Sequence, residues 1–376
     1  IIEAALAAIP IIDSSPALRT LSWHWHWCLY RCGGYSNKVL DQWPSFDSAL
    51  GDLSGMFYLI GLISYVPEMH ANYRSRSIPE KILRDGMYHV YQRGILCAGD
   101  SKKWDLDARN ARGAANFIRG DYYSVGKLTY QLYKLKDPIR VYRNGNLSSI
   151  IALSDDGIVY RPDGHTWMEG EAIDGIWQSL FVDGEKEIVG NPILPTGQVV
   201  PNKLCLLKSQ WHQVLGRGDT VVFFHIPGGT PLDVEECGNS FQMALEFFAN
   251  HFPEDPFRAF FCWSWLLDTQ LEEWLPSTSN LVRFQREFYL YPGEISKESI
   301  LNAVLGNMYH PSTSLDLSQA PRDTKLQRAM LDHVSSGKSV IPRAGRCFML
   351  PDDLGEWGTQ AYRETKFPWY LLDEPT

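Results

Sequence analysis

The chain has 376 residues and a formal net charge of −9, and its hydrophobic (44%) and charged (21%) fractions are those of an ordinary globular protein. At about 150 residues per domain, this length indicates two or three domains. The composition excludes disordered and fibrous classes, and the negative charge without a Lys/Arg block argues against nucleic acid and anionic membranes as partners. The unusual feature is an aromatic content of 13%, with 13 Trp, 18 Tyr and 17 Phe.

The cysteines and the apolar runs indicate the cellular compartment in which the protein is expected. The seven cysteines are odd in number and scattered, which predicts a reducing, cytoplasmic setting and no disulfide framework. The longest apolar run, residues 55–67, has 13 residues, whereas a membrane helix needs about 20, so we expect no transmembrane segment. Because the chain begins with Ile1 and not with Met, we expect a truncated N-terminus.

The first 120 residues or so predict helices. Ser14 and Ser15 precede a segment that begins with Pro16, which is the pattern of a capped helix start, and Gly33-Gly34 would end it. Apolar side chains recur at helical spacing in three later segments. The expected helices span residues 16–31, 48–67, 78–93 and 106–118.

From about Gly120 onward the pattern changes to the alternation typical of strands. Turn signals at 144–145 and 155–157 separate short alternating segments, which predicts an antiparallel meander. The expected strands span residues 128–135, 139–142, 149–153 and 157–161. We expect a Gly- and Pro-rich loop over 183–203 and a short helix over 210–215.

A continuous apolar run, Thr220–Ile226, is suited to a buried central strand. Pro227-Gly228-Gly229 breaks it, and Thr230, Pro231 and Asp233 give a helix-start signal for a helix that runs to about His251. The later expected elements are strands over 258–266 and 280–291 and helices over 267–275, 296–308 and 323–334.

This order of elements, and several segments, resemble a known family. The order from Gly120 onward is that of the GNAT N-acyltransferase core. The amino-acid sequences of several segments are similar to those of a bacterial family of acyltransferases that joins an N-terminal helical domain to a GNAT-like C-terminal domain. The similar segments lie between about 50 and 350, at 57–59, 76–79, 126–128, 225–240, 247–254, 261–268, 275–285 and 324–329.

The resemblance implies an α+β fold, in which a helical N-terminal domain precedes a GNAT-like mixed β-sheet domain flanked by helices. The implied domains are residues 1–120, residues 121–310, and a C-terminal helix and tail over 311–376 that packs on the core. Fold analogy decides no function by itself, so the resemblance implies a reaction class only.

The resemblance also implies acyl-CoA as co-substrate. In a GNAT fold two parallel strands splay apart, the pantetheine arm pairs with the exposed backbone, and the pyrophosphate binds N–H groups at the start of the next helix. Here those strands would be 220–226 and 258–266, and the CoA-binding candidates are Phe224, Ile226, Gly228, Gly229, Thr230, Ser240 and Asn280.

The expected phosphate loop departs from the usual Gln/Arg-x-x-Gly-x-Gly/Ala pattern. Pro227 has no N–H to donate, and the carboxylates of Asp233, Glu235 and Glu236 would repel a phosphate. Ser240 and Asn280 can instead satisfy helix and strand ends. Whether this loop binds the CoA pyrophosphate in the way usual for the family therefore stays open.

Four residues are catalytic candidates. His225 ends the long strand and could remove a proton from an acceptor amine, although a core histidine bonded to a carbonyl fits equally well. Glu235 is the other candidate base, with helix capping as its alternative. Cys262, like Cys237, could be a nucleophile but lies in an apolar pattern typical of core. Ser264 could donate to an acyl carbonyl or fill space, and Arg283 and Gln285 are interpreted as braces of the sheet.

The stretch Trp23–Trp27, which contains His24 and His26, suggests a metal or sugar site. On a helix the two imidazoles lie about 200° apart and cannot chelate one ion, so we interpret the stretch as a packed aromatic helix and expect no metal.

Our leading hypothesis is an acyl-CoA-dependent N-acyltransferase in which a small amine attacks the thioester directly. The alternatives are a catalytically degenerate GNAT scaffold that binds a small molecule or carbohydrate, without an open V between its two strands, and a thiol hydrolase. The expected partners are a small-molecule amine, with neither nucleic acid nor membrane, and a homodimer stays open.

Overall fold

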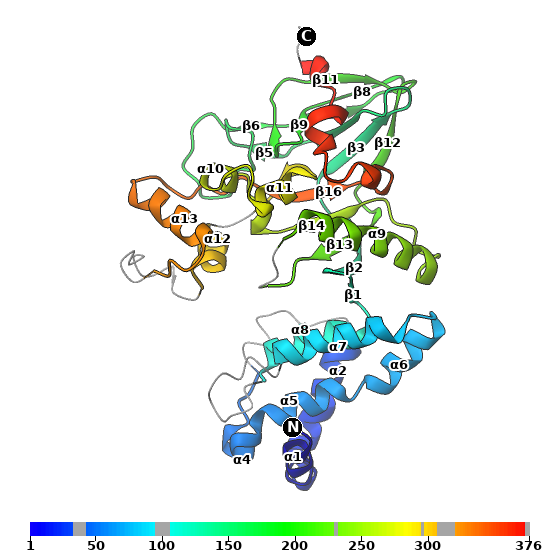
Figure 1. Cartoon of the computed structure of the whole chain (residues 1–376), viewed down its shortest axis with the longest axis vertical. Helices are drawn as coiled ribbons and strands as arrows, with labels where there is room; N and C mark the ends of the chain where they lie inside the picture. Colours follow the sequence, from blue (N-terminus) through cyan, green and yellow to red (C-terminus); the bar gives the residue numbers. More distant parts are fainter. Residues whose placement is uncertain (33–42, 95–105, 229–231, 295–296, 307–319, 373–376) are drawn as a thin grey trace. The chain divides into compact units, whose positions relative to one another are not determined.

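The computed structural model describes residues 1–32, 43–94, 106–228, 232–294, 297–306 and 320–372. The chain divides into two compact units, Ile1–Gln131 with Glu246–Glu254, and Leu132–Leu245 with Asp255–Thr376. Two elements pass from one unit to the other, β2 (Leu128–Lys134) and α9 (Val234–His251). The elements are drawn in Figure 1.

The first unit is built mainly from helices, drawn in blue to cyan in Figure 1. They are α1 (Ile2–Ser14), α2 (Pro16–Tyr30), α4 (Asp47–Leu50), η1 (Gly51–Leu53), α5 (Ser54–Ile63), α6 (Val66–Ser75), α7 (Glu80–Gly94) and α8 (Ala108–Arg119). A hairpin of β1 (Tyr123–Val125) and the start of β2 follows them, with Tyr123 opposite Tyr130.

Local sequence signals set these helix ends. The Ser15 side chain accepts from the Leu18 N–H at the start of α2, and the Asp107 carboxylate accepts from the Asn110 N–H at 2.6 Å at the start of α8. Gly120 ends α8 in the left-handed conformation. Three of the four predicted helices of this half are confirmed as α2, α7 and α8, whereas the stretch 48–67 divides into α4, η1 and α5, and α1 and most of α6 were missed.

The tryptophans of α2 differ in burial, since Trp25 packs in the core whereas Trp23 and Trp27 are exposed. Trp25 is buried, with its ring 5.5 Å from that of Tyr58 and 5.0 Å from that of Trp43. It lies so close to α5 that a Cβ at Gly61 would be 2.2 Å from Trp25 Cδ1. The imidazole of His24 stacks on Trp43, and His26 Nδ1 lies 2.6 Å from Ser64 Oγ.

One helical stretch of this unit, Asp47–Ser75, meets the length and composition criteria for a membrane span, contrary to our expectation from the longest apolar run. Core helices of soluble proteins meet the same criteria, and 44% of the apolar window is buried within the protein. The stretch is therefore weak evidence for a membrane segment.

The second unit contains the sheets that surround the predicted site. The main sheet has the order β2-β13-β14-β16-β15 within this unit, a five-stranded sheet has the order β10-β9-β4-β3-β12, and smaller sheets are β11-β8-β7 and β5-β6. The strands are β3 (Ile139–Asn144), β4 (Ile150–Ser154), β5 (Val159–Tyr160), β6 (Trp177–Gln178), β7 (Phe181–Asp183), β8 (Glu187–Gly190), β9 (Pro192–Leu194), β10 (Gln198–Val199), β11 (Leu204–Leu207), β12 (Trp211–Gly216), β13 (Thr220–His225), β14 (Phe260–Trp263), β15 (Tyr289–Pro292) and β16 (Ala344–Met349).

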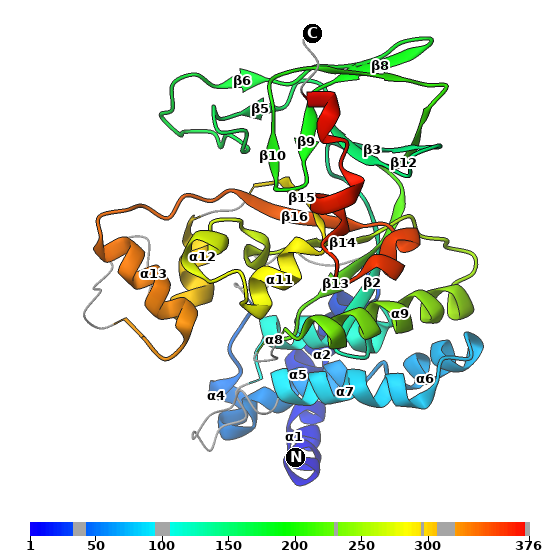
Figure 2. The same ribbon diagram turned by 45° about the horizontal axis from the view of Figure 1, so that its top comes forward.

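Helix α9 packs on the main sheet, where Phe241 contacts Phe224 of β13 and Phe260 of β14. The other helices of this unit are α10 (Leu271–Trp274), α11 (Asn280–Arg286), α12 (Lys297–Leu305) and α13 (Lys325–Ser335), with the short η3 (Trp265–Leu267). Helices α12 and α13 lie together beside the sheet in Figures 1 and 2 and pack on Trp265 and Trp274. The Asp233 carboxylate caps α9 by accepting from the Glu236 N–H at 3.0 Å, while the predicted cap Thr230 lies outside the described residues. The α+β fold class is confirmed.

Three predictions were wrong in this unit, and a fourth element is shorter than predicted. The expected loop over 183–203 contains β8, β9 and β10, and the expected helix over 210–215 is β12, paired with β3. The expected strand over 280–291 divides into α11 and β15, and the strand over 258–266 ends at Trp263. Strand β16 was missed, although it pairs with β14 and β15 through the whole of its length.

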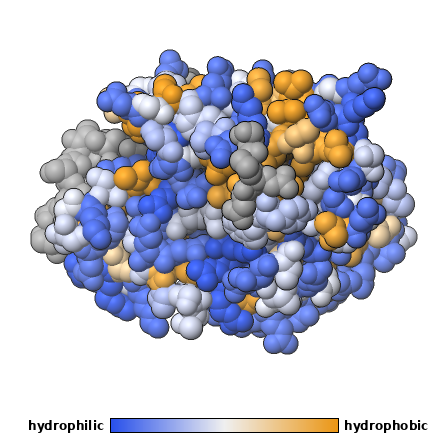
Figure 3. Space-filling model, turned by 90° about the horizontal axis from the view of Figure 1, so that it is seen from above, coloured by the Kyte–Doolittle hydropathy of each residue, from blue (hydrophilic) through white to orange (hydrophobic). Residues whose placement is uncertain are grey.

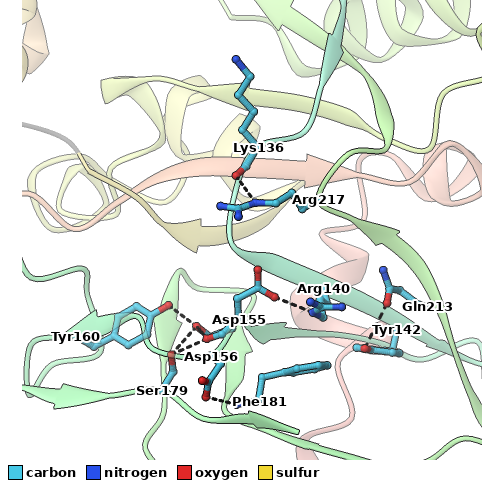
Figure 4. A network of polar contacts seen from close by, with 11 residues as sticks. Lys136, Arg140, Tyr142, Asp155, Asp156, Tyr160, Ser179, Phe181, Gln213 and Arg217 are labelled. Atoms are coloured by element: carbon cyan, nitrogen blue, oxygen red, sulfur yellow. Dashed lines mark hydrogen bonds and ion pairs between the residues drawn. The ribbon is translucent and has the colours of Figure 1, made fainter. Parts of the chain in front are cut away.

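Polar contacts fix the five-stranded sheet, as Figure 4 shows. Arg140 Nε donates to Asp155 Oδ1 at 2.7 Å, and the Arg140 guanidinium lies 4.5 Å from the ring centre of Phe181. Ser179 Oγ donates to the Asp155 carbonyl at 2.7 Å. These contacts join β3 to the turn after β4 and to the segment before β7.

The chain ends in a segment that we call the C-terminal strap, residues 350–372, with the short helices η5 (Pro351–Glu356), η6 (Tyr362–Lys366) and η7 (Trp369–Leu372). Its centre is the buried Asp353, which accepts from Arg143 Nη2 with both oxygens at 3.0 Å and pairs with Lys366 Nζ at 2.9 Å. These bonds attach the strap to β3.

The molecular surface seen in Figure 3 is largely hydrophilic, with apolar side chains in separate clusters. On the three-stranded sheet, Val182 and Leu207 are among the large apolar residues that stay exposed. Scattered exposed apolar residues are normal for folded proteins.

Candidate active site

The pairing between the neighbouring strands β13 and β14 ends before either strand does, and we call the unpaired carboxyl end of the two strands the V. They pair in parallel at two positions, Val222 with Phe260 and Phe223 with Phe261, whereas β13 continues to His225 and β14 to Trp263. The Ser264 N–H donates to the Gly345 carbonyl at 2.8 Å on the β16 side. Since backbone groups of successive strand residues point to opposite sides, the N–H and C=O of Trp263 point toward β13, beyond the last paired position.

The aromatic residues of this region divide between two faces of the sheet. On one face Phe224 is fully buried, with its ring 5.3 Å from Phe288 and 5.1 Å from Phe241 of α9. On the opposite face Trp263 lies 4.5 Å from Phe223 and 5.5 Å from Tyr133. Phe224 and Trp263 therefore do not face each other, because side chains alternate along a strand.

His225 lies on the same face as Trp263. Its imidazole is half-buried and 4.5 Å from the ring of Phe223, which in turn contacts Trp263. Trp263 itself is 46% exposed, an unusual state for so large an aromatic residue. The carboxyl end of the V thus carries the imidazole of His225 and the exposed indole of Trp263 on one face, and the ring of Phe223 contacts both.

A buried ion pair supports this aromatic face from β16. Arg346 pairs with Asp137, and its guanidinium carbon lies 6.0 Å from the centre of the Trp263 ring. The Tyr291 hydroxyl donates to the second oxygen of Asp137 at 2.5 Å. Burial and the Asp137 carboxylate raise the pKa of Tyr291 well above its ordinary value, so that hydroxyl stays protonated.

On the other face of the sheet a cavity of about 440 Å³ lies between α9, α11 and the C-terminal strap. The predicted base Glu235 lines it from the first turn of α9, and Arg283 of α11 lines it from the opposite side. Its other lining residues are Val234, Gly238, Asn239, Gln242, Leu354, Trp357 and Gly358. The structure therefore does not bring the two predicted bases together, because His225 lies on the Trp263 face.

Cys262 and Ser264 are held in structural roles. Cys262 follows Phe260 on the face toward α9 and is buried, and this burial raises the pKa of its thiol far above the ordinary value. A thiolate nucleophile is disfavoured there. Cys237 on α9 is buried as well. Ser264 Oγ accepts from the Leu266 N–H at 3.2 Å and caps η3.

The predicted CoA-binding residues lie in several places. Ile226 and Gly228 follow β13, with Gly228 exposed and free of neighbours within 4 Å of a Cβ position, while Gly229 and Thr230 lie outside the described residues. Ser240 is buried on α9, and Asn280 is exposed at the first position of α11 and not in a strand. Ile226 and Gly228 thus lie at the carboxyl end of the V.

Three residues of the two faces were not singled out from the sequence, namely Tyr133, Arg346 and Trp357, and Arg283 was given a bracing role only. Gln285, predicted to brace the sheet, binds the segment after η3, where Nε2 donates to the Asp268 carbonyl at 3.1 Å. Tyr133 lay in a predicted strand, but no sequence signal paired it with Trp263. Trp357 lies in a strap without helical or strand periodicity, so only its contacts could reveal it.

Two buried titratable groups lie outside both faces. His165 is 1% exposed, and burial together with the guanidinium groups of Arg161 and Arg343 lowers the pKa of its imidazole to about 4. Burial raises the pKa of the Asp268 carboxyl to about 6, although the N–H groups of Arg343 and Gln270 donate to it at 2.9 and 2.8 Å. Their burial makes both groups structural.

In the described part of the chain, no group of three or more His, Cys, Asp or Glu side chains is arranged to hold a metal ion.

These features define a class of protein, an α+β fold in which a splayed parallel strand pair is followed by a helix over one face. A model of the family described as GNAT-like C-terminal domain matches residues 122–347, which is more than half of the chain. The chain therefore belongs to the family with a GNAT-like C-terminal domain, as the resemblance implied. No curated protein matches it.

Solved structures share the fold over nearly the whole chain. An acyltransferase variant in complex with octanoyl-CoA is 19% identical, with a TM-score of 0.57 and coverage of 93% of this chain and 83% of its own. An acyltransferase in complex with decanoyl-CoA is 20% identical (TM-score 0.56, the same coverages). An acyltransferase in complex with decanoyl-CoA and teicoplanin is 18% identical (TM-score 0.55, 90% and 79%).

Proposed function

We propose that this protein is an acyl-CoA-dependent N-acyltransferase that transfers an acyl group to a small-molecule amine. The observation that carries the proposal is the V between β13 and β14, where the backbone of Trp263 faces the space beyond the last paired position. An extended arm with amide groups, such as pantetheine, can add to this edge as a strand would. Solved structures of the same fold hold acyl-CoA, which supports the choice of donor.

The reaction needs no covalent enzyme intermediate. The amine nitrogen attacks the thioester carbonyl carbon, a C–N bond forms, the C–S bond breaks, and the CoA thiolate leaves. The amine loses one proton to a base, and the thiolate takes up one proton. Backbone N–H groups at the V would polarise the carbonyl as negative charge develops on its oxygen.

His225 is the base that this arrangement favours. It lies at the carboxyl end of β13, on the face opposite the cavity between α9 and α11, so an acceptor that approaches this face meets the imidazole. Glu235 lines the cavity on the other face. A base must lie within hydrogen-bond reach of the proton that it removes. Since His225 and Glu235 lie on opposite faces, only one of them can deprotonate an amine that attacks a thioester at one position.

The degenerate-scaffold alternative predicts no open V, and the end of the pairing at Phe223 and Phe261, before either strand ends, argues against it. The thiol alternative needs an accessible cysteine, and both Cys262 and Cys237 are buried. Direct attack by the amine on acyl-CoA therefore has the better support.

The first test is donor binding. Titration of the protein with acetyl-CoA and CoA in a calorimeter should give saturable binding, and CoA at 100 times its dissociation constant should raise the unfolding free energy by about 2.7 kcal/mol. Heat and thermal shift that both stay at baseline with millimolar CoA would overturn the proposal.

The second test is the base. His225→Gln should lower kcat by about 10²- to 10⁴-fold and remove the acidic limb of the kcat/KM pH profile, because the group that accepts the amine proton is lost. Acyl transfer to a panel of primary amines, followed by release of free CoA thiol, measures this. Glu235→Gln is the matched control; if it gives the drop and His225→Gln does not, His225 is not the base.

A further inference from the structure

Trp263 is an exposed aromatic side chain that its neighbours nevertheless hold in place. The indole is 46% exposed. Its ring lies 4.5 Å from that of Phe223, 5.5 Å from that of Tyr133 and 5.7 Å from that of Phe261, each at an interplanar angle of 70–74°. Edge-to-face contacts of this kind stabilise aromatic pairs beyond the area that they bury. The indole is therefore a fixed surface at the carboxyl end of β14, and nearly half of it is accessible to a ligand.

A row of three side chains crosses the sheet from Trp263. Trp263 of β14 lies opposite Arg346 of β16, and Arg346 lies opposite Tyr291 of β15. Directly opposite residues share a face, so their side chains are neighbours. The guanidinium carbon of Arg346 lies 6.0 Å from the centre of the indole. The row thus runs from the exposed ring of Trp263 to Tyr291, which is buried.

Asp137 fixes this row from the segment before β3. One carboxylate oxygen pairs with Arg346, and the other accepts from the Tyr291 hydroxyl at 2.5 Å. Asp137 is buried, and any movement of Arg346 away from it would leave a buried charge without its partner, which is strongly unfavourable. Gly293 leaves room for Arg346, because a Cβ there would overlap its side chain. The position of the Arg346 cation beside the indole is therefore set by the core.

The charges of the row suit an uncharged ring better than an ion. Arg346 pairs with Asp137, and the same guanidinium lies beside the indole. A cation next to the ring makes the binding of a second cation, such as the ammonium group of an amine, less favourable. An aromatic ring carries no net charge and packs on an indole by offset stacking or edge contact. The exposed part of Trp263 is therefore suited to the aromatic body of a ligand.

His225 lies within reach of such a ligand. Its imidazole and the Trp263 indole lie on one face of the sheet, and each ring centre is 4.5 Å from that of Phe223. The two ring centres are therefore separated by no more than twice that distance. A short aliphatic linker between an aromatic ring and its amine spans such a separation, so a ligand that packs on Trp263 can bring its nitrogen to the imidazole.

We propose that Trp263 recognises the aromatic body of the acceptor amine, and that Arg346, held by Asp137 and Tyr291, is a positioning residue for this ring. The inference rests on the proposed function and narrows its acceptor to an arylalkylamine, in which a short aliphatic linker joins an aromatic ring to a primary amine. It also makes acceptor recognition depend on a buried network that does not itself touch the acceptor.

The test compares two acceptors that differ in the aromaticity of one ring. Values of kcat/KM are measured for phenethylamine and for cyclohexylethylamine with saturating acetyl-CoA. The readout is the ratio of the two values, because a general loss of activity cancels in it. The variants are Trp263→Leu, Trp263→Phe, Arg346→Lys and the double variant Trp263→Leu/Arg346→Lys. Trp369→Leu is the matched control, because Trp369 is 41% exposed and lies in η7 of the strap.

Trp263→Leu should lower the ratio about 2- to 10-fold, mainly through the KM for phenethylamine, because the aromatic pair is lost while an apolar side chain remains. Trp263→Phe should keep most of the ratio. Arg346→Lys should lower the ratio by a smaller factor, since lysine keeps the charge but not the planar group that pairs with Asp137. In the double variant Arg346→Lys should add nothing to the effect of Trp263→Leu, because Arg346 acts through the indole. Trp369→Leu should leave the ratio unchanged.

The inference is overturned if Trp263→Leu lowers kcat/KM equally for both amines, or changes neither value. An Arg346→Lys effect of the same size with and without Trp263→Leu would show that Arg346 does not act through the indole. If Arg346→Lys fails to fold, Tyr291→Phe takes its place in the same comparison, because it removes only the hydroxyl that donates to Asp137.

Failure of the proposed function gives a different result. A wild-type protein that binds acetyl-CoA but transfers the acetyl group to neither of these two amines overturns the inference alone, whether or not other primary amines are acylated. A wild-type protein that binds no acetyl-CoA overturns the proposed function itself.

Discussion

At the scale of single residues, His225 is the predicted base whose surroundings the structure describes. The sequence places it at the end of a buried strand, and the structure adds the exposed Trp263 on the same face and the V beside it. Cys262, in contrast, takes the core role that its apolar neighbours indicated, because its side chain points to the face covered by α9.

The buried residues His165 and Asp268 provide a prediction for pH. His165 has a pKa lowered from 6.5 to about 4, so the unfolded chain binds the extra proton first, and stability falls as pH drops from 6.5 to 4. Asp268 has a pKa raised from 3.8 to about 6, so the folded chain holds its proton longer, and stability falls as pH rises from 3.8 to 6. Each effect is about 3 kcal/mol, and in the wild type they oppose each other.

Single variants separate the two effects. His165→Gln removes a contribution that makes stability rise with pH, so between pH 4 and pH 6 its stability should rise less steeply, or fall more steeply, than that of the wild type. Asp268→Asn removes a contribution that makes stability fall with pH, so its stability should rise more steeply than that of the wild type over the same range. Urea unfolding at half-unit pH steps measures both slopes, and two variants that keep the wild-type slope would contradict the assigned burial effects.

At the scale of elements, local spacing explains the wrong predictions. Trp211 and Leu215 are buried and four apart, which suits one face of a helix. In β12 the register shifts between Gln213 and Leu215, so the two residues lie on opposite faces, and pairing with β3 selects the strand. The segment 280–291 combines a seven-residue helix with a strand, and Val282, Phe284 and Phe288 are buried in either description. The strands of 183–203 are two to four residues long, too short for alternation to show.

The close contact between α9 and the C-terminal strap gives a prediction of unusual sign. Gly238→Ala should destabilise the protein by about 1–3 kcal/mol, because the added Cβ would lie 2.5 Å from Trp357 Cδ1 and overpack the contact. Gly113→Ala in α8 is the matched control, since no atom lies within 4 Å of its Cβ position, and it should stabilise by about 0.5–1 kcal/mol. Denaturant unfolding compares the two, and a stabilising Gly238→Ala would show that the strap does not lie against α9.

At the scale of the whole molecule, contacts between residues far apart in the sequence hold the second unit together. Tyr289 of β15 accepts from the Ala152 N–H of β4 at 3.1 Å, and its ring stacks on Phe348 of β16 at 4.8 Å, so one buried side chain joins two sheets. The strap joins β3 through Arg143 and Asp353, which are 210 residues apart.

A substitution at Asp353 tests how much the strap contributes to stability. Asp353→Ala should destabilise the protein by about 3–5 kcal/mol, because it removes the buried carboxylate that pairs with Arg143 and Lys366, of which Lys366 keeps its pair with Glu356. The control is Asp332→Ala, which breaks the exposed pair with Arg322 and should cost at most about 1 kcal/mol. Equal losses in guanidinium chloride unfolding would mean that Asp353 does not anchor the strap.

Much of the fold was predictable, because its signals are local. Capping residues, apolar periodicity and the buried run at 220–226 identified most helices of the first unit, β13 and α9, and the resemblance gave the family and the α+β class. These signals depend on backbone hydrogen bonding and side-chain spacing within one segment, which a sequence displays directly.

Only the tertiary structure decided how the site is divided. The sequence placed His225, Glu235 and the aromatic residues within one stretch of chain, but alternation along β13 and β14 sends Phe224 into the core under α9 and leaves Trp263 with His225 on the other face. The cavity that Glu235 lines needs α11 and the strap, whose contribution depends on pairings across more than a hundred residues. Long-range packing, and not local propensity, determines which residues share a face.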